Sequence, residues 1–209
     1  DLLYHYPRSY IDLSSPCAVA EAPSDEVCAI LATVIKKSGE IRARSGLKIY
    51  KVTAADDSGI LELTFFNTKF LVDQLKYDVP YLFYGRAEGS SRRRMMSAPS
   101  IYPADSGRPF AAVYSLTAGL TGGVLSGLIM RALKLNLQPP EILSESVRLT
   151  HGLIGIQEAI RAIHCPLGRE ELERARRRLI FEELFTLAAG IGALKTHTRV
   201  RRAAAMQPH

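Results

Sequence analysis

Two phenylalanines that could stack on nucleic-acid bases lie close together in the segment TFFNTKF, residues 64–70. Phe66 and Phe70 stand four positions apart, across the end of an apolar run. Stacking on an exposed ring contributes on the order of 1–3 kcal/mol per base and uses only the flat face of that base. Burial is the alternative: Phe70 with Leu71 could plug the base of a barrel, and Phe66 could pack on the N-terminal residues or the C-terminal helices.

Three consecutive arginines, Arg92, Arg93 and Arg94, form the second candidate site, beside the turn GSS. Adjacent positive charges on a strand edge suit contacts with DNA phosphates, although a solvated hairpin is the simpler interpretation. A further basic run is predicted to form the polar face of a helix, because its first and last members are one turn apart. This run contains Arg174, Arg176, Arg177 and Arg178.

The sequence contains no recognisable catalytic motif. It has no phosphate-binding loop of the Gly-x-x-x-x-Gly-Lys-Ser/Thr type, no His-Glu-x-x-His and no Gly-x-Ser-x-Gly. The histidines are dispersed, and His164 is interpreted as a partly buried, hydrogen-bonded residue at a helix end. We therefore expect no catalytic residue and no metal site in this chain.

The composition is that of a globular protein with a basic surface. The net charge of +6 and the pI of about 9.3 favour polyanionic partners, nucleic acid among them.

The three cysteines, Cys17, Cys28 and Cys165, show no metal-binding spacing and indicate a reducing compartment, so we expect a cytoplasmic protein. No apolar run reaches the roughly 18 residues of a membrane span, and no signal peptide is visible. The start at Asp1 suggests a piece of a longer chain.

Five predicted strands, with one short helix between the third and the fourth, give the order of an OB barrel. Alternation in the third strand places Leu61, Leu63 and Phe65 on the inner face. Phe66 should therefore point outward and be exposed. The strands are expected at residues 26–37, 47–56, 60–67, 79–89 and 92–103, and the short helix at 68–75.

The residues after Pro103 are predicted to be mostly helical, with a long final helix at 169–194. That helix begins with charges and ends nearly all apolar, so its second half must be buried against something. The expected fold is mixed β and α. It comprises an irregular lead-in at 1–25, a five-stranded OB-type β-barrel at 26–104 and a mostly α-helical segment at 105–209.

Six blocks of the sequence resemble, in order and at similar spacing, the N-terminal part of the RecG family of bacterial ATP-dependent DNA helicases. The blocks are DLLYHYPRSYID, KVTAADDSGILELTFFN, MSAP, VYSLTAGL, AIHCP and ARRRLIFEEL. The resemblance implies that 26–104 is the wedge domain at the branch point of DNA, and that 105–209 is a linker toward a helicase motor absent from this chain. It also implies that Phe66 and Phe70 stack on bases where the strands separate.

The sequence departs from the family pattern at Ala98, where histidine is usual, and at Ser115 and Ala118, where proline and glutamate are usual. These differences touch no catalytic position, but they could alter the hairpin or the stiffness of the linker. The resemblance also implies that ATP and magnesium belong to the full-length protein, and we expect no cofactor in this chain.

The resulting hypothesis is the branched-DNA-binding wedge region of an ATP-dependent helicase that reverses stalled replication forks and branch-migrates Holliday junctions in recombination and repair. The implied partners are branched DNA and the motor domains of the same chain, with no membrane. Two alternatives remain open: an OB-fold protein-interaction module that uses the apolar C-terminal helix, and a general single-stranded nucleic-acid-binding domain. A steep loss of binding with added salt would favour phosphate contacts over a protein interface.

Overall fold

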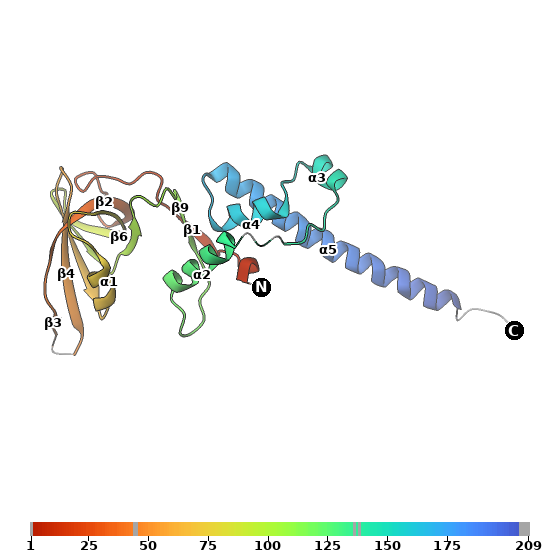
Figure 1. Ribbon diagram of the computed structural model, residues 1–209, viewed down its shortest axis with the longest axis horizontal. Coiled ribbons are helices and arrows are strands. Elements are labelled where there is room, and N and C mark those ends of the chain that lie inside the picture. The colour runs from red at the N-terminus through yellow and green to blue at the C-terminus, as the bar shows by residue number, and fades with distance from the viewer. Residues whose placement is uncertain (1, 44–45, 136, 138, 205–209) are drawn as a thin grey trace. The chain divides into compact units, whose positions relative to one another are not determined.

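The chain folds into two compact units (Figure 1). The computed structural model describes residues 2–43, 46–135, 137 and 139–204, with side chains through residue 196. We call residues 12–109 the barrel unit, and residues 1–11 together with 110–209 the helical unit. The lead-in expected at 1–25 is thus divided between the two units.

Five strands close into a barrel in the barrel unit. They are β2 (Glu26–Lys37), β4 (Lys48–Ala55), β5 (Ile60–Phe66), β6 (Pro80–Ser90) and β7 (Arg93–Ser97). Neighbours follow the order β2-β4-β5-β7-β6, and β6 pairs again with β2, so the sheet closes on itself. The pairing of β5 with β7 is parallel and the others are antiparallel. The mixed fold and the five-stranded OB-type barrel predicted from the sequence are confirmed.

Two short strands extend this sheet: β3 (Ile41–Arg42) pairs with β4, and β8 (Ser100–Pro103) pairs with β6. The strand expected at 92–103 is therefore two strands, β7 and β8. The break falls at Ala98, whose φ of 47° lies in the left-handed region that costs a non-glycine residue about 1–2 kcal/mol. The Ala98 amide donates to the Thr64 carbonyl at 2.7 Å, so the last hydrogen bond to β5 is made where the chain turns away.

The barrel core follows from the alternation of β5. Leu61 and Leu63 are completely buried and Phe65 is 2% exposed, as the sequence pattern predicted. The short helix α1 (Lys69–Gln74) closes the core with Val72, and Leu75 follows at its end; each is 3% exposed. Residues 12–25 pack on the barrel through Val19, whose amide donates to Asp56 Oδ2 at 2.8 Å.

The helical unit contains a small sheet and four α-helices among the described residues. Its elements are the 3-10 helix η1 (Leu2–Tyr4), strands β1 (Ser9–Asp12) and β9 (Phe110–Val113), and helices α2 (Gly122–Lys134), α3 (Glu145–His151), α4 (Ile156–His164) and α5 (Arg169–Ala204). The two strands pair with each other. The main core lies between α4 and α5, where Ala159, Ile160 and Ala175 are buried.

Helix α5 is longer than the predicted 169–194 and continues to Ala204 (Figure 1). The expected burial of its apolar half is not seen within the described residues, because Leu184 and Leu187 are each 60% exposed. Among all the residues that the structure describes, no helix is both long enough and apolar enough to cross a membrane.

Candidate nucleic-acid interface

Phe66 and Phe70 are both exposed, at 37% and 72% of their surface. Phe66 is the last residue of β5 and points outward, which confirms the position predicted from alternation. Phe70 is the second residue of α1, and the alternative that it plugs the barrel is wrong, because Val72 and Leu75 occupy that place. The spacing of Val72 and Leu75, three residues apart on one helical face, is the signal that could have identified the plug.

The turn between the two phenylalanines is tied to the neighbouring strand. Asn67 has a φ of 54°, a left-handed conformation that asparagine tolerates better than most residues. Its amide donates to the Lys48 carbonyl at 2.8 Å, and its side-chain Oδ1 accepts from the Lys48 amide at 3.1 Å. Helix α1 begins two residues later, so the direction in which Phe70 leaves the barrel is set by these hydrogen bonds.

Phe66 also belongs to an apolar row across the outer surface of the sheet. In the strand register, Phe66 lies opposite Ile49 of β4, and Ile49 lies opposite Ile41 of β3. Ile41 is 45% exposed and Ile49 is half-buried. Directly opposed side chains on one face lie about 5 Å apart, so Ile49 supports one edge of the Phe66 ring.

Only two of the three candidate arginines are available to a ligand. Arg92 and Arg93 are exposed, and Arg93 pairs with Glu62 through Nη2 and Oε1 at 2.6 Å. Arg94 is 6% exposed and donates to the carbonyl oxygens of Gly89, at 2.6 Å, and Ala22. The phosphate contact proposed for Arg94 is therefore incompatible with the structure.

The physical reason is the alternation of β7. Arg94 and Met96 share the inner face, where Met96 is 1% exposed, while Arg93 and Met95 face outward. The sequence RRRMM already contained this signal, but a run of like charges conceals the difference between its members.

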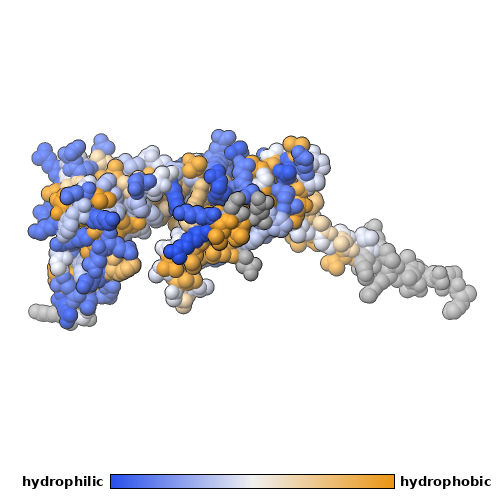
Figure 2. Space-filling model, viewed as in Figure 1, coloured by the Kyte–Doolittle hydropathy of each residue, from blue (hydrophilic) through white to orange (hydrophobic). Residues whose placement is uncertain are grey.

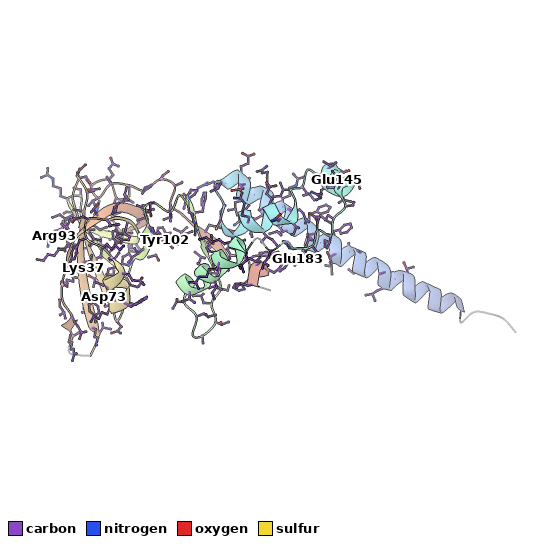
Figure 3. All side chains as sticks on the ribbon, viewed as in Figure 1. Lys37, Asp73, Arg93, Tyr102, Glu145 and Glu183 are labelled. Atoms are coloured by element: carbon purple, nitrogen blue, oxygen red, sulfur yellow. The ribbon has the colours of Figure 1, made fainter. Side chains whose placement is uncertain are left out.

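The aromatic pair and the exposed arginines lie at opposite ends of β5. Arg93 is in register with Ile60, the first residue of β5, whereas Phe66 is the last. Six steps of about 3.3 Å separate these ends by roughly 20 Å. Figure 3 labels Arg93 towards one end of the barrel and Asp73, in α1, towards the other.

The hairpin of β3 and β4 lies beside the end of β5 that carries Phe66. Glu40 partly neutralises the positive charges of this hairpin. Its carboxylate accepts from Arg42 Nε at 2.7 Å and from the Tyr50 hydroxyl at 2.7 Å, and it lies 3.3 Å from Lys48 Nζ. The bonds from Arg42 and then Tyr50 lower the pKa of Glu40 to about 2. The basic character of this hairpin is therefore smaller than its count of lysines and arginines suggests.

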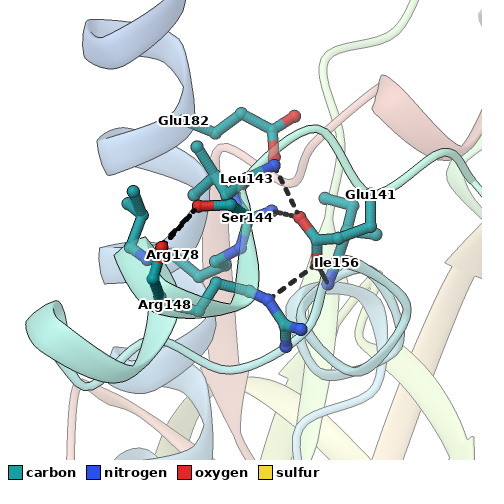
Figure 4. Close-up of polar contacts among 9 residues, drawn as sticks. Glu141, Leu143, Ser144, Arg148, Ile156, Arg178 and Glu182 are labelled. Carbon is teal, nitrogen blue, oxygen red and sulfur yellow. Dashed lines mark hydrogen bonds and ion pairs between the residues drawn. The ribbon is translucent and has the colours of Figure 1, made fainter.

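The second basic run does not form a free polar face on α5. Arg178 is completely buried and makes ion pairs of 2.5 Å with Glu141 Oε1 and Glu182 Oε2 (Figure 4). Glu141 also accepts from the amides of Leu143 and Ile156 at 3.1 and 3.0 Å. Burial raises the pKa of Glu141, but these bonds and the Arg178 charge outweigh it, so the pKa lies below its ordinary value.

The other members of this run are also engaged. Arg174 lies 3.9 Å from Glu158, Arg176 stacks over the Tyr10 ring at 5.2 Å, and Arg177 donates to the His151 carbonyl at 3.0 Å. The prediction that this run forms the polar face of a helix is wrong for Arg178, which is buried. Its partner Glu141 is 37 positions away, so helical periodicity could not reveal the pair.

His164 is the buried, hydrogen-bonded histidine expected at a helix end. Its Nε2 lies 2.9 Å from the Leu3 carbonyl and its Nδ1 lies 3.0 Å from the Tyr114 hydroxyl. Because a carbonyl only accepts, Nε2 carries the proton and Nδ1 accepts from Tyr114. Burial lowers the pKa of His164, which keeps the ring neutral in this arrangement.

Within the residues that the structure describes, no group of three or more His, Cys, Asp or Glu side chains is placed to hold a metal ion. The visible surface of the barrel unit is largely hydrophilic, with hydrophobic residues between hydrophilic ones (Figure 2).

These features define a class of protein: an OB-type barrel joined to a helical unit, with one exposed aromatic ring at the end of its third barrel strand and another in the helix that follows. The model of the RecG wedge domain matches residues 1–135. The chain belongs to the RecG wedge domain family.

Curated relatives agree with this assignment. The ATP-dependent DNA helicase RecG of Synechocystis sp. is 27% identical over 210 residues, which cover 91% of this chain and 25% of the relative. The helicase of the same name from Streptococcus pneumoniae is 26% identical, with 96% and 30% covered. This chain thus spans between a quarter and a third of the length of these relatives.

A solved structure described as RecG bound to a three-way DNA junction is similar to this chain. The TM-score is 0.75 at 20% identity, and the match covers 94% of this chain and 28% of that one. The likeness shows that the two share their fold.

Proposed function

We propose that this chain is the branched-DNA-binding wedge region of a RecG-like ATP-dependent helicase, which reverses stalled forks and branch-migrates Holliday junctions. The observation that carries the proposal is the exposure of Phe66 and Phe70, on either side of a turn held by Asn67. Membership of the RecG wedge domain family supports it.

The two rings would stack on the bases at the branch point, where unpaired bases have free faces. Each stacked base contributes on the order of 1–3 kcal/mol, comparable to the mean of about 1.4 kcal/mol per base step that unpairing costs. The rings therefore hold bases apart once they are separated, but they cannot drive repeated separation. At the far end of β5, Arg92 and Arg93 would contact phosphates of a DNA arm.

Repeated separation needs a source of energy outside these residues. We assign it to a motor in the longer protein that binds ATP and magnesium and acts as the second partner of this region. We further expect such a protein to work in the cytoplasm, where it meets replicating DNA. This chain alone should bind branched DNA without unwinding it.

The test is a comparison of affinity for a three-way fork, single-stranded DNA and duplex DNA of equal length, at two salt concentrations. The variants are Phe66→Leu with Phe70→Leu, which keep apolar bulk and remove the rings, and Leu71→Ala, an exposed neighbour on α1, as the matched control. We expect the double leucine variant to lose the fork preference with its salt dependence unchanged. Equal binding of all three DNAs by the unaltered chain would refute the proposal.

A groove in the helical unit favours a second candidate function, a protein-interaction role. Its volume is about 1130 Å³, and it is lined by Tyr4 and Tyr6 on one side and by Ile180, Leu187 and Ile191 of α5 on the other. An apolar surface of this kind is typical of a protein contact. Binding of a protein through the groove should vary little with salt, unlike binding of DNA.

A further inference from the structure

We infer that Lys37 is a positioning residue for Phe70: its ammonium group holds the C-terminal end of α1, the short helix that carries Phe70. The inference rests on the proposed function and deepens it, because it names a residue that acts on the stacking site without touching DNA. It is carried by a bulge in β2 and by the contacts that Lys37 makes at the end of α1.

Helix α1 cannot fix the direction of Phe70 by its own hydrogen bonds. It has six residues, and isolated helices shorter than about 12–15 residues are marginal in water. Within the described part of the chain, Thr68 at its N-terminus makes no side-chain capping hydrogen bond. Phe70 is two positions before buried Val72, about 200° around the helix, so the ring lies away from the face that packs on the core. The position of the ring therefore depends on how the two ends of α1 are held.

A bulge in β2 aims Lys37 at this helix. The register between β2 and β4 shifts after Val34, and Lys37 then lies opposite Val52. Val52 is 1% exposed, so this position of β4 faces the core. Strict alternation from buried Val34 would instead turn Lys36 inward and Lys37 outward. The bulge reverses this: Lys36 is exposed, and Lys37 is half-buried on the side of the barrel that α1 closes.

Lys37 meets the C-terminal end of α1 at two points. Its ammonium group donates to the carbonyl oxygen of Leu75, the C-cap residue of α1, and lies 5.1 Å from the centre of the Tyr77 ring. The last carbonyls of a helix have no partner within it, and a lysine is favourable there both as a donor and as a positive charge. The aromatic ring attracts the ammonium group and so favours this position. Lys37 thus connects β2 to the end of α1.

The two ends of α1 are therefore held from different strands. Asn67 bonds to Lys48 of β4 before the helix begins, and Lys37 of β2 bonds to Leu75 where it ends. Without the Lys37 contact, the end of α1 is free to move, and the Phe70 ring has to be ordered when DNA binds. Ordering one side chain on binding lowers affinity roughly two- to tenfold.

The test is a double-mutant cycle on the whole chain, with binding of a three-way fork and of a plain duplex titrated over a range of salt. Lys37→Met keeps an unbranched stem and removes the charge, whereas Lys37→Arg keeps a charged donor. Lys37→Met is measured both alone and in a Phe70→Ala background. Lys134→Met, which removes an exposed positive charge from the helical unit, is the matched control.

We expect Lys37→Met to weaken fork binding roughly two- to tenfold and to leave duplex binding and the salt dependence unchanged. Lys37→Arg should recover most of the loss. In the Phe70→Ala background, Lys37→Met should have no further effect, because no ring is left to position. Lys134→Met should bind both DNAs as the unaltered chain does.

A loss of fork affinity that persists in the Phe70→Ala background would overturn the inference. So would a salt slope reduced by about 0.7–0.9, because that is the mark of a lost phosphate contact. Tyr77→Leu removes the ring beside the ammonium group and should give a smaller loss of the same kind, which tests the inference if Lys37→Met does not fold. Equal binding of fork and duplex by the unaltered chain would refute the proposed function itself.

Discussion

Asn67 and Lys48 exchange two hydrogen bonds at the point where β5 ends, one from the Asn67 amide and one to its side chain. The pair joins the turn after Phe66 to the neighbouring strand and so determines where α1 and Phe70 begin. A stacking site made of two rings works only if both are held in place before DNA binds, since ordering them on binding would cost affinity. The two hydrogen bonds between Asn67 and Lys48 hold the turn between the rings in place before DNA binds.

Replacing Asn67 with alanine should therefore reduce both stability and fork binding. Alanine lacks the side-chain acceptor and is strained at a φ of 54°, so we expect a loss of about 1–2 kcal/mol in the free energy of unfolding. Denaturant titration measures this. Asn67→Gly, which tolerates the backbone conformation, should be less destabilised, and equal losses for the two variants would argue against strain as the cause.

Arg93 and Arg94 are neighbours in sequence with opposite expected effects. Arg94→Ala leaves the Gly89 and Ala22 carbonyls without their charged donor and should cost about 1.5–3 kcal/mol of stability. Arg93→Ala breaks an exposed ion pair worth at most about 1 kcal/mol, and should lower DNA affinity instead. Unfolding and DNA titrations on both variants separate these roles, and a stable Arg94→Ala variant with weakened DNA binding would reverse our assignment.

The buried Arg178 should be far more important for stability than its neighbour Arg174 on the same helix. Removing one partner of a buried, hydrogen-bonded ion pair typically costs about 3–5 kcal/mol, so Arg178→Ala should destabilise strongly. Arg174→Ala, which removes an exposed contact of 3.9 Å, should cost less than about 1 kcal/mol. Thermal unfolding of the two variants gives the comparison, and similar midpoints would contradict the burial of Arg178.

His164 should make stability depend on pH. Its folded pKa is lowered, mainly by burial, so the unfolded chain takes up a proton first as pH falls. The stability is therefore full above the unfolded pKa of about 6.5 and declines as pH drops below it. Unfolding measured at pH 7.5 and 5.5 should show the loss. His164→Gln should flatten the dependence in this window, and an unchanged slope would exclude His164 as its source.

Local sequence patterns predicted most of the barrel and part of the candidate site. Alternation alone placed Phe65 inside and Phe66 outside, because one face of β5 is uniformly apolar. The same rule, applied to β7, would have separated Arg94 from Arg93. For Phe70, the sequence left open whether the side chain is buried under the barrel or exposed. Val72 and Leu75 fill the barrel core instead, so Phe70 is exposed.

What could not be predicted depends on contacts between distant residues. Glu141 and Arg178 form an ion pair although they are 37 positions apart, so no periodic pattern in the sequence connects them. The bulge that turns Lys36 outward arises from the pairing of β2 with β4. Ala98 adopts a left-handed conformation that its residue type disfavours, because β7 must end there for β8 to pair with β6. These features are set by the assembled sheet and not by local sequence.

The most direct measurement places a fluorescent adenine analogue at the branch point of a three-way fork and, in a second fork, at an interior position of a duplex arm. Binding of the unaltered chain should change the fluorescence at the branch point only, because Phe66 and Phe70 stack on unpaired bases there. Phe66→Ala with Phe70→Ala should abolish that change at saturating protein. An identical signal from the double variant would contradict the assignment of the two rings to the branch.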